Sequence, residues 1–323
     1  MAACRPATGP TAFPQRAARR NSRCRAAAAA AISLILVAVA PLGSGALAYT
    51  SAGDRLFPAT ILLPQISPGD EFYTNIIDMP LEGGGIGTPN HQTNFNAVFA
   101  KTITDRLGVF VEETYTRLGT VGAGTLSGWQ NFDMSLKYLT VLDLPHEFLF
   151  TVAVDREFGG TGARRVGASP SGATTPQLFF GKGMGDLYIG YLRPVALTGF
   201  AGYQAAYSRP GPVAAVGGLV LEYSIPYLQS KVESFDLPEL VRNLTPMTEF
   251  QFSTPAGRSF GTRTTALFAP GVSYAGEGWE LAIEALVPAS RATGRGVGVT
   301  AQLHLALDFL APDTIGHPLF STP

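Results

Sequence analysis

Four polar residues near the end of the sequence have types and a spacing that could do chemistry: Glu280, Glu284, His304 and Asp308. In VGVTAQLHLALDF, residues 297–309, every odd-numbered residue is apolar and every even-numbered residue is small or polar. This alternation predicts a β-strand with one apolar face, and it places His304 and Asp308 on the other face. The preceding segment, 279–287, places Glu280 and Glu284 on its own polar face. If the connection is centred near Ala292, Glu280 lies directly across from His304.

This cluster has two interpretations. As a functional site, it would orient a ligand, hold a cation, or pair an acid with a histidine of tuned basicity. As a structural feature, it would be a set of hydrated, mutually paired charges in a polar interior. Asp133 and Lys137 share the polar face of another segment, 129–140, and we interpret them as interior salt-bridge partners.

Other motifs of catalysis or cofactor binding are missing from the sequence. The four histidines show no metal-ligand spacing, and a G-x-S-x-G hydrolase elbow is absent. The glycine-rich stretches at 83–87 and 181–185 lack the strand–loop–helix context of a phosphate-binding loop. We therefore expect a protein that is not an enzyme and that uses no metal or cofactor.

The segments that would position these residues follow one another along the chain after residue 70. They alternate with period two and are separated by clusters of Gly, Pro, Ser or Asn. The predicted strands are 71–78, 93–103, 106–118, 129–140, 147–158, 185–194, 199–208, 213–227, 247–253, 263–275, 279–287 and 297–309. Residues 159–182 are predicted to form a long glycine-rich loop, and residues 235–243 are predicted to form a short helical insertion.

Strand length indicates the architecture. Strands of soluble β-sandwiches have about 5–6 residues. The 13 residues of 297–309 would span about 43 Å, enough to cross a bilayer core of about 30 Å at a tilt. Aromatic residues near predicted strand ends are typical of interfacial girdles: Tyr73, Tyr115, Trp129, Phe158, Tyr207, Tyr227, Tyr274, Trp279 and Phe309. The sequence predicts an all-β protein: a single closed antiparallel transmembrane β-barrel of about 12 strands (10–14).

The N-terminal segment has the layout of a secretory signal peptide. A basic region without acids precedes the apolar run 26–40, and ALA at 46–48 fits a cleavage site. We expect residues 1–48 to be cleaved after Ala48, leaving 49–323 as an outer-membrane barrel with a short Pro-containing tail, 310–323. A membrane anchor is the alternative, but an apolar run of about 15 residues is short for a spanning helix. No apolar run of 18 or more follows residue 48.

Charge and cysteine content restrict the classes of molecule that the protein can be expected to bind. Both cysteines fall in the leader, so the remaining chain has neither disulfides nor thiolate metal sites. That chain carries 17 basic and 24 acidic residues, a net charge of −7, which disfavours nucleic-acid binding. The expected partners are outer-membrane lipid and lipopolysaccharide, the barrel-assembly machinery, and a small-molecule substrate that the sequence does not identify.

Two stretches carry a resemblance to a known family: GMGDLYIGYLRP at 183–194 and AQLHLALDFLAPDTIGHPLF at 301–320. With the strand pattern over most of 55–320, the chain resembles the Gram-negative outer-membrane β-barrel transporters of the meta-pathway phenol-degradation type. The resemblance implies a barrel with a channel for small molecules. One departure is the tail, because such barrels commonly end on a strand with a terminal aromatic, whereas here Phe320 is followed by three residues.

The expected function is therefore an outer-membrane channel or transporter for small molecules, apolar or aromatic ones among them. A soluble periplasmic β-sandwich or adhesin-like module is the alternative, and it would need charges on one face of its longest strands. A barrel-borne lipid-modifying enzyme is the lesser alternative. It would need catalytic groups facing outward, whereas the alternation places His304 inward.

Overall fold

The computed structural model describes residues 50–82, 85–207, 213–256 and 263–320. The chain divides into two units, Met1–Ser44 and Gly45–Pro323, and only the second contains described residues. The predicted signal peptide, 1–48, lies outside them. In the described part of the chain, no helix is long and apolar enough to cross a bilayer.

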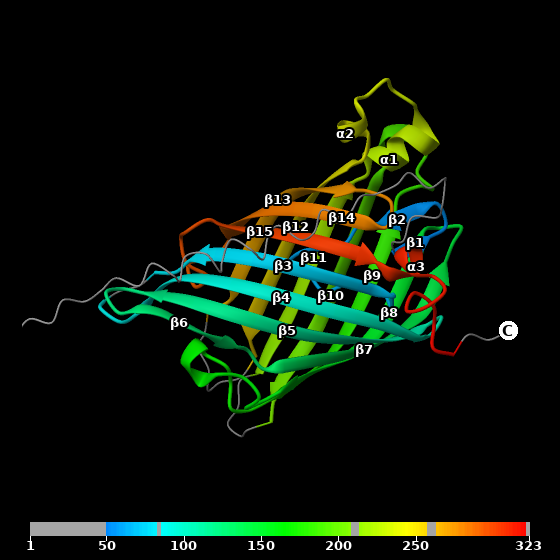
Figure 1. Ribbon diagram of the computed structural model, residues 1–323. Coiled ribbons are helices and arrows are strands. Elements are labelled where there is room, and N and C mark those ends of the chain that lie inside the picture. Colours follow the sequence, from blue (N-terminus) through cyan, green and yellow to red (C-terminus); the bar gives the residue numbers. More distant parts are fainter. Residues whose placement is uncertain (1–49, 83–84, 208–212, 257–262, 321–323) are drawn as a thin grey trace, which may run out of the picture. The chain divides into compact units, whose positions relative to one another are not determined.

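The second unit is a closed antiparallel barrel of twelve strand positions (Figure 1). The strands are β3 (Glu71–Pro80), β4 (Pro89–Thr104), β5 (Leu107–Thr120), β7 (Phe132–Asp143), β8 (Phe148–Phe158), β9 (Ala173–Gly183), β10 (Val195–Ala206), β11 (Val213–Tyr223), β12 (Leu244–Pro255), β13 (Thr265–Ala275), β14 (Trp279–Pro288) and β15 (Gly298–Ala306). Each pairs with the next along the chain, and β15 pairs with β3 to close the ring. A further strand, β6 (Gly124–Trp129), pairs with the second half of β5, residues 115–120. The first half of β5, residues 107–112, pairs with β7, so β6 and β7 lie along the same edge of β5. The predicted all-β closed barrel is confirmed.

The predicted strand count is right, but one strand was misplaced. Residues 185–194 form a connection that contains a 3-10 turn, η2 (Gly190–Leu192), and not a strand. The strand is β9, within the segment that we predicted to be a loop. Its sequence, ATTPQLFFGKG, contains Pro176 and does not separate polar from apolar residues by parity, so the period-two signal is weak there. The two errors cancel in the count.

The two faces of the wall differ in polarity. Large apolar side chains are exposed on the outer face of the strands: Ile76, Phe95, Phe99, Met134, Leu136, Val152, Val154, Leu178, Leu219, Leu221, Phe250, Phe268, Leu281, Ile283 and Val299. The inner face carries amides, hydroxyls and carboxylates. This is the reverse of a soluble domain and matches a wall with lipid outside. A two-sheet sandwich is excluded because the described strands close into a single sheet.

The aromatic side chains form pairs on the outer face near both strand ends. Ring centroids are 5.2 Å apart in Tyr115–Trp129 and 5.6 Å apart in Tyr274–Trp279. Two of the predicted girdle residues are placed elsewhere. Tyr73 is buried on the inner face of β3, and Tyr227 is buried in the helical turn α1 (Ile225–Tyr227).

We call the end of the barrel where β3 begins and β15 ends the termini end, and the opposite end the distal end. The termini end carries α1, a π-helical turn η3 (Leu228–Val232) and the helix α2 (Glu239–Arg242), all in one connection (Figure 1). The predicted helical insertion at 235–243 thus contains α2. The short helix α3 (Leu307–Leu310) follows β15 at the same end, and η1 (Arg164–Val166) lies in a distal connection.

Residues 50–70 fill part of the lumen, and we call them the plug. The plug begins with a hairpin, β1 (Thr50–Ala52) and β2 (Arg55–Phe57). Its tight turn needs Gly53, whose φ is 63° and where a Cβ would lie 2.3 Å from the carbonyl oxygen of Leu144. Plug and wall side chains share one hydrophobic cluster: Ala52, Phe57, Leu63 and Ile66 from the plug, and Leu139, Leu149, Phe179, Ala196, Phe200, Val220 and Met247 from the wall.

One carboxylate on β12 receives the middle of the plug. Glu249 is fully buried, and its two oxygens accept the backbone N–H groups of residues 61, 62 and 63 at 2.7, 3.0 and 2.8 Å. An inserted segment without secondary structure has backbone donors that the lumen must satisfy. Charge-assisted bonds of this kind are about twice as strong as neutral ones. Glu249 therefore holds the plug in the lumen.

Glu249→Ala should release the centre of the plug. Three buried N–H groups lose their acceptor, at a cost on the order of 1–3 kcal/mol each. Hydrogen exchange of the amides of residues 61–63 should therefore accelerate at least about tenfold. Thr248→Ala, one residue away on the outer face, is the matched control and should leave those amides slow. Equal exchange rates in both variants would show that Glu249 does not hold the plug.

Candidate functional site

The predicted pair of Glu280 and His304 is present in the wall. The register of β14 and β15 places these residues directly opposite each other, as a connection centred near Ala292 requires. Both are buried on the inner face. The residues are neighbours, but their hydrogen bonds go to other partners.

His304 bonds to an acid that sequence reasoning missed. Its Nε2 lies 2.6 Å from Oε2 of Glu71, the first residue of β3. The Tyr73 ring lies beside the imidazole, with centroids 5.9 Å apart. Glu71 is reached because the last strand closes against the first, with Ala306 opposite Glu71. A closed barrel predicts that contact between strands, but the sequence does not supply its register.

Glu280 bonds to the plug, and Glu284 is buried in the wall beside it. Glu280 accepts the backbone N–H of Ala59 at 3.1 Å. Glu284, four residues on, is 1% exposed and faces Thr300 across the strand pair. The structure thus places both carboxylates on the predicted inner face, but Glu284 does not lie opposite His304.

The placement of Asp308 in the strand is wrong. β15 ends at Ala306, because β14 begins at Trp279 and β3 begins at Glu71, so later residues have no wall to pair with. Asp308 lies in α3 and is exposed. The alternation of residues 297–309 therefore extends beyond the strand, which has nine residues and not thirteen.

Asp133 and Lys137 do face the lumen, but they form no salt bridge with each other. Within the described ranges, Lys137 appears in no ion pair; its Nζ donates to the carbonyl oxygen of Gln65 in the plug. The ammonium also lies over the rings of Phe110 and Phe179, at 4.1 and 4.7 Å from their centroids. Burial under the plug separates Lys137 from Asp133, which pairs in register with Glu112 of β5.

The plug is anchored at the termini end by Arg55. Its guanidinium is fully buried, forms an ion pair with Glu147 at 3.3 Å and donates to the carbonyl oxygen of Pro194 at 3.0 Å. It also lies 4.1 Å from the ring centroid of Tyr227, whose hydroxyl donates to Glu147 at 2.9 Å. Burial and then Glu147 raise the pKa of Tyr227 to about 12. One side chain thus joins three separate connections.

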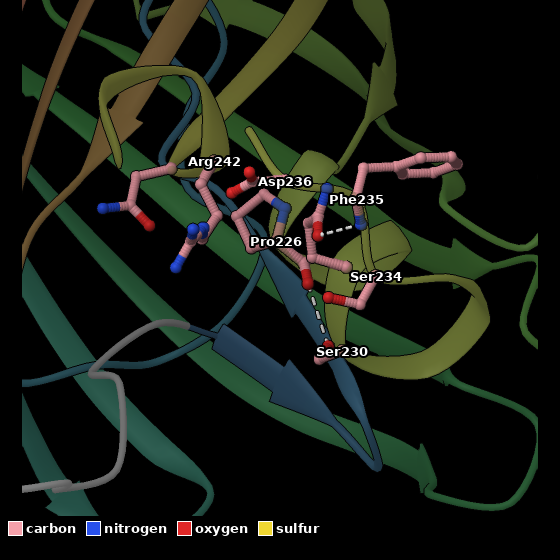
Figure 2. Close-up of a pocket in the computed structure, with 8 residues that line it drawn as sticks. Pro226, Ser230, Ser234, Phe235, Asp236 and Arg242 are labelled. Carbon is pink, nitrogen blue, oxygen red and sulfur yellow. Dashed lines mark hydrogen bonds between the residues drawn. The ribbon is translucent and has the colours of Figure 1, made fainter. Parts of the chain in front are cut away.

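A cavity next to the plug and a cavity outside the lumen are each large enough to hold a small molecule. One, of about 280 Å³, lies on the distal side of residues 61–64 and is walled by β3, β4, β5 and β12. We call it the vestibule. The other, of about 650 Å³, lies outside the lumen in the connection that carries α1 and α2, where Figure 2 shows Pro226, Ser230, Phe235 and Arg242 around it. The predicted polar cluster lines neither cavity.

A metal site is not evident from the side chains. Among the residues that the structure describes, no group of three or more His, Cys, Asp or Glu is arranged to hold a metal ion. The lumen instead presents hydrogen-bond acceptors and negative charge. What this arrangement can do chemically is bind polar and cationic molecules in the space that the plug leaves in the lumen.

No model of a known protein family matches the chain, and no curated protein is similar to it in sequence. Several solved barrels share a weak structural likeness. The COG4313 outer membrane channel from Pseudomonas putida F1 has 10% identity and a TM-score of 0.49, covering 78% of this chain and 99% of that one. KdgM porin has 9% identity and a TM-score of 0.42, covering 72% and 98%. LpxR from Salmonella typhimurium has 9% identity and a TM-score of 0.39, covering 72% and 99%. The closed barrel is established by its own strand pairings.

Proposed function

We propose that this protein is an outer-membrane channel or transporter for small molecules, closed in this structure by the plug. One observation carries the proposal: a closed twelve-strand wall with an apolar outer face surrounds a polar lumen that one short segment fills. Twelve strands lie between the side-chain-filled eight-stranded barrels and the open porins. A lumen of that width needs an inserted segment to be closed.

The cellular setting belongs to the same proposal. Cleavage of the leader after Ala48 would place the new N-terminus one residue before β1, so the plug could enter the lumen from the termini end. The outer face would contact membrane lipid, the distal connections would contact lipopolysaccharide, and folding would need the barrel-assembly machinery. A transporter of the meta-pathway phenol-degradation type, with aromatic substrates, is the finer form of the proposal.

The lipid-modifying enzyme is the weaker candidate. Such an enzyme needs its catalytic groups on the outer face, in reach of lipid. His304 is 2% exposed and bonded to Glu71 inside the lumen. The proposal therefore keeps transport and assigns no catalytic residue.

Loss of the plug anchor should open the channel. Arg55→Leu removes the ion pair with Glu147 and leaves that buried carboxylate uncompensated, a change that destabilises by about 3–5 kcal/mol in buried pairs. In planar bilayers we expect low conductance from the parent and frequent large openings from the variant. Arg242→Leu, an exposed arginine at the same end, should behave as the parent does. If deletion of residues 50–69 also leaves conductance unchanged, the barrel is not a plugged channel.

The opened lumen should prefer cations. Its inner face carries Glu112, Asp133, Asp155, Glu222, Glu249, Glu280 and Glu284, against Lys137 and His304. Like-signed walls concentrate counter-ions in a narrow pore. The reversal potential of the plug-deleted barrel in a KCl gradient should therefore indicate potassium over chloride. A chloride preference would contradict the assignment of these acids to the conducting path.

A charged substitution should destabilise the barrel only at outer-face positions that contact lipid. Ile283 is 52% exposed in the middle of β14, so Ile283→Arg should lower the free energy of unfolding in lipid vesicles by about 2–4 kcal/mol. Ile189, 58% exposed in the connection after β9, provides the control variant Ile189→Arg, with little expected loss. Equal losses at the two positions would place no lipid around the strands.

A further inference from the structure

The vestibule is a cavity within the lumen, next to the plug. Residues 61–64 of the plug form its floor, with apolar side chains, and Tyr73 stands in its wall. Its volume of about 280 Å³ is near the lower limit of ligand pockets, about 300–1,000 Å³. Glu112 points inward and is nevertheless solvent-exposed, so the space in front of it is accessible to water.

Three amide side chains in the vestibule wall donate hydrogen bonds to the plug or to neighbouring wall residues. Asn75 donates to the carbonyl oxygen of Ile61 at 3.2 Å, and Gln251 donates to that of Leu62 at 3.2 Å. Backbone carbonyls only accept, so these bonds fix which end of each amide faces the plug. Asn96 donates to Glu112 and to the hydroxyl of Thr114.

The acceptor of the vestibule that a ligand can reach is the carboxylate of Glu112, which lines the cavity and is solvent-exposed. Asn75 also lines the vestibule, but it is only 6% exposed. Its Oδ1 accepts no hydrogen bond from any described residue and is itself buried. The carboxylate of Glu112 is therefore the group that would receive a donor from a ligand.

The charge of the vestibule lining is negative, because Glu112 is its charged residue, and two further acids lie near Glu112 outside the lining. Glu112 lies directly opposite Asp133, and Asp133 lies in the register of β7 and β8 two positions from the pair Ser135–Asp155. None of these three acids takes part in an ion pair within the described ranges. The nearest lysine, Lys137, is held under the plug by Gln65.

We propose that the vestibule binds a small organic cation: an ammonium group carried on a compact apolar or aromatic body. The ammonium bonds to the carboxylate of Glu112, because an N–H donor that carries a positive charge matches an accessible negative acceptor. The apolar body lies on the floor of residues 61–63 beside the Tyr73 ring. The idea that such cations are transported rests on the proposed channel function. The binding site itself does not depend on that function.

The test is calorimetric titration of the folded, full barrel in detergent with three probes of one shape. They are phenethylammonium, neutral 2-phenylethanol and anionic 3-phenylpropionate. We expect the cation to bind at least about tenfold more tightly than either of the others, since one charge-assisted bond to the Glu112 carboxylate amounts to about that factor. Equal binding of the neutral probe, or no heat with the cation, would overturn the proposal.

Variants locate the site. Glu112→Gln should weaken phenethylammonium at least about tenfold, whereas Glu113→Gln, the adjacent residue on the outer face, should leave affinity unchanged. Asn94 also lines the vestibule, and its Oδ1 accepts from Thr116 and Gln92. Asn94→Asp keeps that oxygen and adds a charge, so it should tighten binding, a gain that misfolding cannot produce. Equal affinities of the Glu112 and Glu113 variants would place the cation elsewhere.

The outcome separates this site from the channel. Conductance of the plug-deleted barrel without binding of the cation to the intact one would refute the site and keep the channel. Binding without conductance would refute the channel and keep the site. Heat-modifiable migration on a detergent gel shows for each variant that the barrel has folded.

Discussion

The backbone of an inserted segment has to find hydrogen-bond partners inside the barrel, and the rest of the lumen is built around that constraint. Residues 58–70 have no regular structure, so their N–H and C=O groups cannot satisfy one another. The wall supplies the partners. Glu249 and Glu280 accept plug N–H groups, while Asn75, Gln251, Gln302 and Lys137 donate to plug carbonyls. Glu280, which the sequence places in a candidate reaction centre, is thereby explained as part of the receptor for the plug.

Much of this architecture follows from the sequence, because period-two alternation reports which face a residue takes. It predicts the closed barrel, the inner face of Glu280, Glu284 and His304, and the register that sets Glu280 opposite His304. It does not predict where pairing stops. Asp308 continues the alternation, yet it lies beyond the ends of both neighbouring strands, which is a property of those strands and not of its own.

The plug and the partner of His304 could not be read from the sequence for a related reason. The segment 58–70 contains Pro58, Pro64 and Pro68 and has no periodicity, so it resembles a linker. Its role depends on contacts with residues more than a hundred positions away, as between Ile61 and Glu249. Glu71 is reached by ring closure, whose register depends on all the intervening strands. The local sequence pattern indicates neither these long-range contacts nor the register of ring closure.

The acidic residues of the lumen divide into two groups: those that accept hydrogen bonds from the plug and those that do not. Glu249 and Glu280 receive backbone N–H groups from the plug, so part of their charge is compensated while the plug is seated. Glu112 faces the water-accessible vestibule and accepts no bond from those donors, and Asp133 lies opposite it in the wall. The same residues, 61–63, cap Glu249 on one side and form the vestibule floor on the other. The proposed cation would contact Glu112 of the wall together with a floor that exists only while the plug is seated, so by linkage its binding would favour the seated plug.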